Sequence, residues 1–165
     1  MADSFIPGPD TARALRSAFG RFATGVTVVT ATGERGPVGI TANSFTSVSL
    51  NPPLLLWCPA KSSRRHAAFT AAEHFALHVM GTHQDAITWA FANAAEAFEH
   101  CDCVPSGHGV PLIAGCPVRF ECTTRERLDA GDHTVIIGHI DRVTVEDGPE
   151  ARVFLSGDYG HFSPL

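Results

Sequence analysis

The chain has 165 residues, enough for one domain with a hydrophobic core, and its 44% hydrophobic and 18% charged content is typical of a globular protein. The formal net charge of −5 argues against a nucleic-acid partner, because phosphates require a basic face. No apolar stretch approaches the ~18 residues of a membrane span, so we expect no membrane insertion.

The N-terminus and the cysteines indicate a compartment. Met1–Asp10 lacks the basic start and apolar block of a secretory signal peptide. The five cysteines are an odd number, which without a signal peptide is typical of reduced thiols. We therefore expect a cytoplasmic protein.

The first third of the chain predicts a helix followed by strands. Asp10 is a plausible N-cap for a helix whose apolar residues, up to Phe22, recur at helical spacing, and Gly25 ends it. The tetrapeptide Gly33–Gly36 predicts a hairpin turn. Pro52 and Pro53 mark a strand start or edge. Strands are predicted at residues 26–31, 38–45, 46–50 and 54–58.

The middle of the chain predicts two short helices on either side of a strand. Ser63 is expected to cap a helix that runs through Phe69. A strand is expected from Phe75 to Met80. Thr82-His83-Gln84-Asp85 resembles a capping box and predicts a helix through Phe91.

The second half of the chain is predicted to form long strands. Val118, Phe120 and Cys122 alternate with polar residues, which predicts a half-buried strand. Asp129–Asp132 predicts a turn, and His133–Val145 a long returning strand in which Gly138 indicates a bulge or a close backbone approach. A last strand is expected at residues 153–155. Many short strands with few helices favour a closed antiparallel barrel.

One segment points to a ligand. Gly39–Pro53 is rich in small, hydroxylic and amide residues and carries no charge. A buried strand pair needs fewer hydroxyls, and a solvent-facing pair normally carries Lys or Glu. Dense neutral donors beside exposed backbone suit an oxygen-rich, partly flat, partly anionic ligand, and a flavin with its phosphate is such a ligand.

The chain resembles the short-chain flavin reductases of two-component monooxygenases, which share the FMN-binding split-barrel fold. The similarity runs from about Phe19 to Phe162, so we expect one flavin reductase-like domain over residues 1–165 with its core at about 19–162. The matching segments are Phe22–Thr30, Gly39–Pro53, Val110–Ile113 and Gly131–His133.

The resemblance implies a mainly β fold with flanking helices, an antiparallel, Greek-key-like split barrel. It also implies a homodimer that binds FMN or FAD, uses NADH or NADPH as reductant, and releases reduced flavin to a separate oxygenase component. The sequence leaves open which flavin and which nicotinamide nucleotide are used.

The resemblance assigns flavin contacts along the neutral segment. The residues beside the isoalloxazine and ribityl chain would be Thr41, Ala42, Asn43 and Ser44. Further hydroxyls and backbone N–H groups would come from Ser47, Val48 and Ser49. Preorganised donors near N1 and C2=O stabilise the charge that reduction creates. Cys58 is expected to line the flavin site as a small residue, not to act as a nucleophile.

A basic segment follows. Lys61-Ser62-Ser63-Arg64-Arg65 places cations and hydroxyls at a predicted helix start, an arrangement that favours a phosphate. We assign the flavin phosphate to Ser62, Ser63 and Arg64, the alternative being a solvated basic loop. Arg65 departs from the Thr frequently seen in the family.

His133 is the catalytic candidate. On position alone a single His is usually structural, but Gly131-Asp132-His133 matches the family triplet, which implies contact with the nicotinamide nucleotide. Hydride transfer to flavin N5 needs alignment more than acid–base chemistry, so no proton transfer is assigned to it. Asp132 would shape the turn or orient His133. Tyr159 either covers the flavin or nicotinamide or simply packs.

Other sites and functions were weighed. His100-Cys101-Asp102-Cys103 lacks the second ligand pair of a typical metal site, so no metal is predicted. No Gly-x-Gly-x-x-Gly occurs, which argues against a Rossmann fold. The alternatives to a flavin reductase are a split-barrel flavoprotein that keeps its flavin and acts on an organic substrate, and a non-enzymatic flavin- or haem-binding protein.

Overall fold

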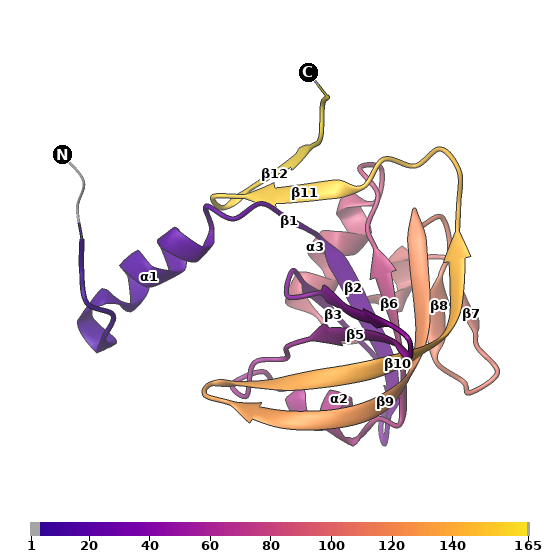
Figure 1. Cartoon of the computed structure of the whole chain (residues 1–165). Helices are drawn as coiled ribbons and strands as arrows, with labels where there is room; N and C mark the ends of the chain where they lie inside the picture. The colour runs from indigo at the N-terminus through magenta and orange to yellow at the C-terminus, as the bar shows by residue number, and fades with distance from the viewer. Residues whose placement is uncertain (1–3, 165) are drawn as a thin grey trace.

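The computed structural model describes residues 4–164 and is dominated by one antiparallel sheet of seven strands in the order β3-β2-β6-β9-β10-β5-β4 (Figure 1). Smaller sheets join β1-β11-β12 and β7-β8. The strands are β1 Thr24–Gly25, β2 Thr27–Gly33, β3 Gly36–Ala42, β4 Thr46–Leu50, β5 Pro53–Trp57, β6 His74–Val79, β7 Cys103–Pro105, β8 Pro111–Ile113, β9 Val118–Ala130, β10 His133–Val145, β11 Arg152–Leu155 and β12 Asp158–His161. The helices are α1 Ala12–Phe19, α2 His66–Ala71 and α3 Asp85–Asn93, with short 3₁₀ turns at Pro9–Thr11 and Ala97–His100.

The sheet is a split barrel, not the closed barrel favoured by strand count alone. Its outer strands, β3 and β4, are joined through residues 43–45, and no ladder pairs them. The order of strands in the sheet differs from their order in the chain. β6 lies between β2 and β9, and β10 lies between β9 and β5. The mainly β, antiparallel, Greek-key-like prediction is confirmed, and closure is corrected to a split between β3 and β4.

The split persists because α3 and the segment after it occupy the free edge of β3. The Gly39 N–H donates to the Ala95 carbonyl over 2.9 Å, and Thr41 Oγ1 donates to the Thr88 carbonyl over 2.6 Å. The Gly39 N–H of the edge strand is thereby satisfied, and the Thr41 side chain ties the same strand to α3. Glycine is required at position 39, since a Cβ there would lie 2.4 Å from the Phe91 ring.

The core lies inside the curved sheet. Trp57 and Phe69 meet edge-to-face with ring centroids 5.0 Å apart, and Phe75 lies 6.2 Å from Trp57. Gly138 allows the same Phe75 ring to approach β10, where a Cβ would lie 2.5 Å from it. The register of the β9–β10 hairpin shifts between Ile137 and Gly138, so the predicted bulge is confirmed.

The N-terminal helix ends earlier than predicted. α1 stops at Phe19, which leaves Phe22 beyond it, and it has no buried residue. In Figure 1, α1 projects from the barrel beside the ribbon of β1, β11 and β12. The apolar stripe that suggested a longer helix therefore packs on nothing within this chain's barrel.

Two other predicted helix starts are wrong. α2 begins at His66, because the Ser63 carbonyl accepts the His66 N–H and Ser63 Oγ accepts the Arg65 N–H. α3 begins at Asp85 without a side-chain cap, and the Asp85 carboxylate, the expected acidic member of the box, accepts from Arg152 instead. Among residues 4–164, no helix is long and apolar enough to cross a membrane.

Candidate functional site

The neutral segment lies at the split of the barrel. Thr41 and Ala42 end β3, Asn43 and Ser44 lie in the connection, and 47–49 belong to edge strand β4. Ser44 Oγ accepts the Cys58 N–H over 2.9 Å, which fixes the connection against the residue that follows β5. The Thr41 hydroxyl already donates to α3, so it is not free to donate to a ligand.

Edge strand β4 adds exposed backbone next to this connection. The register between β4 and β5 shifts between Ser47 and Ser49, which leaves Val48 at a bulge with 45% of its surface exposed. Ser47 is exposed and Ser49 is half-buried. A bulged edge leaves main-chain N–H and C=O groups available to a ligand.

Cys58 is half-buried, and burial raises the pKa of its thiol above the ordinary value. A neutral thiol is a poor nucleophile, which agrees with a lining role.

The predicted phosphate segment and the His133 hairpin are direct neighbours. Ala60 forms an antiparallel bridge with His133, the Thr134 N–H donates to the Pro59 carbonyl, and the Lys61 N–H donates to the Asp132 carbonyl over 2.8 Å. These contacts extend the pairing of β5 with β10 beyond the end of β5. The segment assigned to the flavin phosphate and the residue assigned to the nicotinamide nucleotide therefore lie next to each other.

The helix-terminus part of the phosphate assignment is corrected. The backbone N–H groups of Ser63, Arg65 and His66 are all bonded within the protein, and α2 starts after the segment. The side chains of Ser62 and Arg64 are exposed, whereas Ser63 is half-buried. Arg65 turns away from solvent and donates to the Phe91 carbonyl over 2.6 Å, so it caps the end of α3.

His133 lies at the start of β10 with its imidazole oriented by its neighbour. His133 Nδ1 is 2.7 Å from Asp132 Oδ1, and this bond, together with the charge of a protonated imidazole, lowers the pKa of the Asp132 carboxyl. An ionised carboxylate only accepts hydrogen bonds, so Nδ1 carries the proton. Nε2 is then directed away from Asp132.

Several predicted residues lie elsewhere. Tyr159 contacts Trp89 of α3 and Phe154 of β11, with ring centroids 5.3 and 5.4 Å away, and packs against the buried cluster that includes Phe91 and Met80. Phe91 is fully buried and packs against the half-buried Phe98, so the Phe91 ring is not available to a ligand or a partner.

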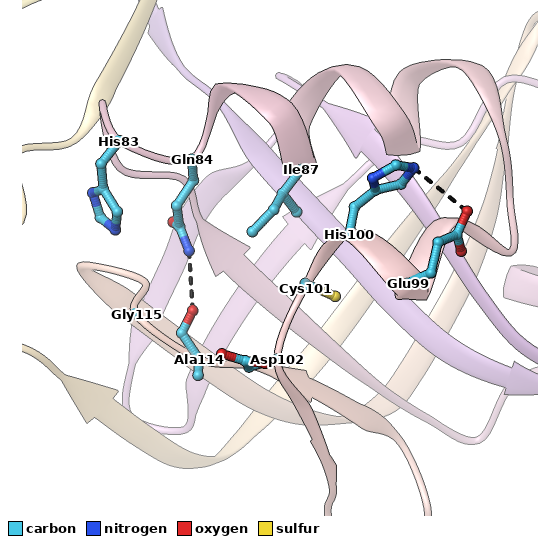
Figure 2. Close-up of a pocket in the computed structure, with 9 residues that line it drawn as sticks. All are labelled: His83, Gln84, Ile87, Glu99, His100, Cys101, Asp102, Ala114 and Gly115. Atoms are coloured by element: carbon cyan, nitrogen blue, oxygen red, sulfur yellow. Dashed lines mark hydrogen bonds and ion pairs between the residues drawn. The ribbon is translucent and has the colours of Figure 1, made fainter.

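A separate cleft contains none of the predicted site residues. The cleft has a volume of about 410 Å³ and lies between the start of α3 and the segment Glu99–Asp102. Figure 2 shows its lining residues, among which the Gln84 amide donates to the Ala114 carbonyl. Cys101 and Cys103 bring their sulfurs to 2.7 Å near it, and burial raises the pKa of Cys101 to about 12. Within residues 4–164, no cluster of three or more His, Cys, Asp or Glu could hold a metal ion.

Comparison with known proteins decides the family. A family model described as a flavin reductase like domain matches residues 19–163. The chain belongs to the flavin reductase-like family.

Its relatives in this family include characterised reductases. The chain is 50% identical over 159 residues to the FMN reductase (NADH) SmoA of Agrobacterium fabrum, covering 96% of this chain and 91% of that protein. It is 35% identical to HsaB, the reductase subunit of a flavin-dependent monooxygenase of Mycobacterium tuberculosis, covering 92% and 83% of the two chains. Other curated relatives are longer, and the chain spans 59%, 49% and 43% of their lengths.

A solved structure agrees with the fold. The NADH:FAD oxidoreductase SgcE6 of Streptomyces globisporus, in complex with NAD and FAD fragments, superimposes with a TM-score of 0.89 at 39% identity and covers 98% of both chains.

Proposed function

We propose that this protein is an NAD(P)H-dependent flavin reductase that supplies reduced FMN or FAD to a separate flavin-dependent monooxygenase. The observation that carries the proposal is the pairing of Ala60 with His133 in a member of this family, because it places the candidate phosphate segment beside the candidate nicotinamide residue. A flavin reductase must hold both ligands at hydride-transfer distance.

The residues at the split fit a flavin. Asn43 and Ser47 are exposed next to the open edge of β4, and they offer neutral donors to a ring with several carbonyl and nitrogen acceptors. Exposed Ser62 and Arg64 offer a hydroxyl and a guanidinium to a phosphate. When bound, the flavin supplies the chemistry of accepting a hydride and leaving in reduced form.

The chain's own residues bind and orient. Donors of the connection and of β4 hold the ring, and the half-buried Cys58 excludes water from one side. His133, oriented by Asp132, contacts the nicotinamide nucleotide through the imidazole face or Nε2. Because hydride transfer to the flavin needs alignment more than acid–base chemistry, we assign His133 an aligning role, and Asp132 fixes the orientation of its ring.

Steady-state assays separate the proposed reductase from its alternatives. NADH or NADPH oxidation should rise and saturate as free FMN, FAD or riboflavin is added, and stopped-flow reduction with each pair should identify the preferred ligands. A flavin that stays bound through gel filtration, with no stimulation by free flavin, would instead favour a flavoprotein that acts on an organic substrate.

The phosphate assignment predicts a selective loss of affinity. Ser63→Ala combined with Arg64→Ala should weaken FMN binding, since charge-assisted hydrogen bonds contribute on the order of 1.5–3 kcal/mol each. Riboflavin, which has no phosphate, should bind as before, and Arg35→Ala in the β2–β3 turn is the matched control. Equal losses for FMN and riboflavin would remove the phosphate from this segment.

We also infer a cytoplasmic homodimer with the flavin near the subunit interface. All five cysteines are free. Phe19 of α1 and Phe22 after it are 69% and 78% exposed, Phe162 after β12 is 75% exposed, and Trp89 of α3 is 55% exposed. Apolar patches of this kind typically mark an interface, and a second copy covering them would also close the split that one subunit leaves open.

The homodimer is tested by coupled mutation. Phe19→Ser with Phe22→Ser should shift sedimentation from dimer to monomer and weaken flavin binding, whereas Phe5→Ser alone should have less effect. A monomer that binds flavin with undiminished affinity would refute an interface role in the site.

A further inference from the structure

Beyond Arg127, whose guanidinium donates to the Thr70 and Ala72 carbonyls, the tip of the β9–β10 hairpin has little support from the rest of the protein. Residues 125–132 are all exposed, and in Figure 1 the hairpin extends well beyond the rest of the sheet. Gly131 turns the chain there with a φ of +66°. His133 directly follows this tip, so anything that fixes the tip also fixes the imidazole.

Lys61 bonds the tip at three points. Its backbone N–H donates to the Asp132 carbonyl over 2.8 Å. Its Nζ donates to the Gly131 carbonyl over 2.7 Å and to Asp129 Oδ2 over 2.5 Å. The hydrogen bond and charge of Lys61 lower the pKa of the Asp129 carboxyl, so this carboxylate is ionised at neutral pH.

These contacts give Lys61 a different role from its neighbours Ser62 and Arg64. Two donors of its ammonium are already held by the hairpin, and its side chain leans across the turn toward Asp129. The same residue begins the segment assigned to the flavin phosphate. We propose that Lys61 is a positioning residue that fixes the His133 hairpin tip against the flavin-phosphate segment and so sets the nicotinamide in register with the flavin.

This inference rests on the proposed function, because it assigns the nicotinamide to His133. It differs from the simplest interpretation of a basic segment, in which every cation binds phosphate. A phosphate ligand would affect FMN and not riboflavin, whereas a residue that positions the hairpin affects NADH use with either flavin.

The test compares Lys61→Met, which keeps the aliphatic stem, with Asp129→Asn and with the double variant. Arg125→Met, another exposed cation on the same hairpin, is the matched control. For each variant, kcat and KM for NADH are measured with FMN and with riboflavin, together with the Kd of each flavin. Hydrogen exchange over residues 128–134 reports the order of the tip itself.

We expect Lys61→Met to raise the KM for NADH roughly five- to tenfold with both flavins, since exposed ion pairs are individually weak but small displacements of a hydride donor are costly. The ratio of FMN to riboflavin affinity should not change, and exchange at the tip should accelerate. Asp129→Asn should act in the same direction with a smaller effect, because the Gly131 contact remains, and the double variant should be no worse than Lys61→Met. Lys61→Arg should restore part of the KM.

Loss of FMN affinity with riboflavin affinity retained would overturn the inference, as would unchanged KM and unchanged exchange in an active Lys61→Met protein. A wild-type protein that oxidises neither NADH nor NADPH with any flavin would instead overturn the proposed function. In that case, slower hydrogen exchange at the tip of the wild type than of Lys61→Met would show only that Lys61 orders the hairpin, without a role in positioning the nicotinamide.

Discussion

His133→Ala is expected to lower kcat/KM for the nicotinamide nucleotide by about 10- to 100-fold, since a misplaced hydride donor costs rate steeply. The structure supports this direction, because His133 begins β10 beside the phosphate segment and Asp132 orients its ring at 2.7 Å. Flavin affinity should change little. Stopped-flow flavin reduction at varied NADH concentration measures the effect and separates binding from transfer.

The variant Asp132→Asn and the thermal stability of His133→Ala distinguish alignment from packing. Asp132→Asn keeps a hydrogen-bond acceptor near Nδ1 but removes the carboxylate, so it should lower kcat/KM for the nicotinamide nucleotide less than His133→Ala does. A His133 that merely packs would instead give an alanine variant with lower thermal stability and weaker binding of both ligands. Unchanged reduction kinetics in a stable, flavin-loaded variant would remove His133 from the mechanism.

Local patterns predicted the fold wherever local forces decide it. β10 has the predicted bounds, His133–Val145, because β-branched residues follow a turn whose Gly131 adopts a positive φ. Patterns failed where distant contacts compete. Asp85 resembled the acidic residue of a capping box, yet its carboxylate accepts from Arg152, 67 residues away. β12 was missed because it is four residues long and gains its pairing only from β11.

In the candidate site, too, local patterns predicted individual residues but not the contacts between distant segments. The neutral and basic segments stand out by composition alone, so their residues could be proposed from the sequence. Their spatial relations could not, because Lys61 and Asp129 are 68 residues apart and no local pattern connects them. Likewise, nothing in the sequence around Arg65 indicates that it caps α3 at Phe91. The individual ligand contacts remain predictions.

His78 was not singled out by the sequence, yet the structure makes it a determinant of stability. It is fully buried on β6, its Nδ1 lies 2.9 Å from the Val28 carbonyl, and its Nε2 accepts the Ile113 N–H over 3.1 Å. The neutral ring with its proton on Nδ1 satisfies both contacts. A second proton on Nε2 would face the Ile113 N–H, so the site accepts only the uncharged form.

Acidification is therefore expected to destabilise the fold through His78. Burial, opposed by the Val28 hydrogen bond and reinforced by Arg119, lowers the pKa of His78 to about 4. The unfolded chain takes up this proton near the ordinary His value of about 6.5, so between there and about 4 the unfolded state binds more protons than the folded one. The free energy of unfolding should fall by about 3 kcal/mol across that window and be independent of His78 above it.

Urea denaturation of the wild type and of His78→Gln, from about pH 7.5 to about pH 4.5 at one protomer concentration, measures this effect. Glutamine keeps a donor and an acceptor but does not titrate, so the variant should be less stable at neutral pH and its stability should depend less on pH. The carboxylates of Asp129, Asp132 and Asp141, whose pKa values are lowered, lose their stabilising contribution only below the ordinary Asp range, outside most of this window. The difference between the two proteins thus isolates His78, and parallel pH profiles would show that the buried imidazole is not the group that senses acid.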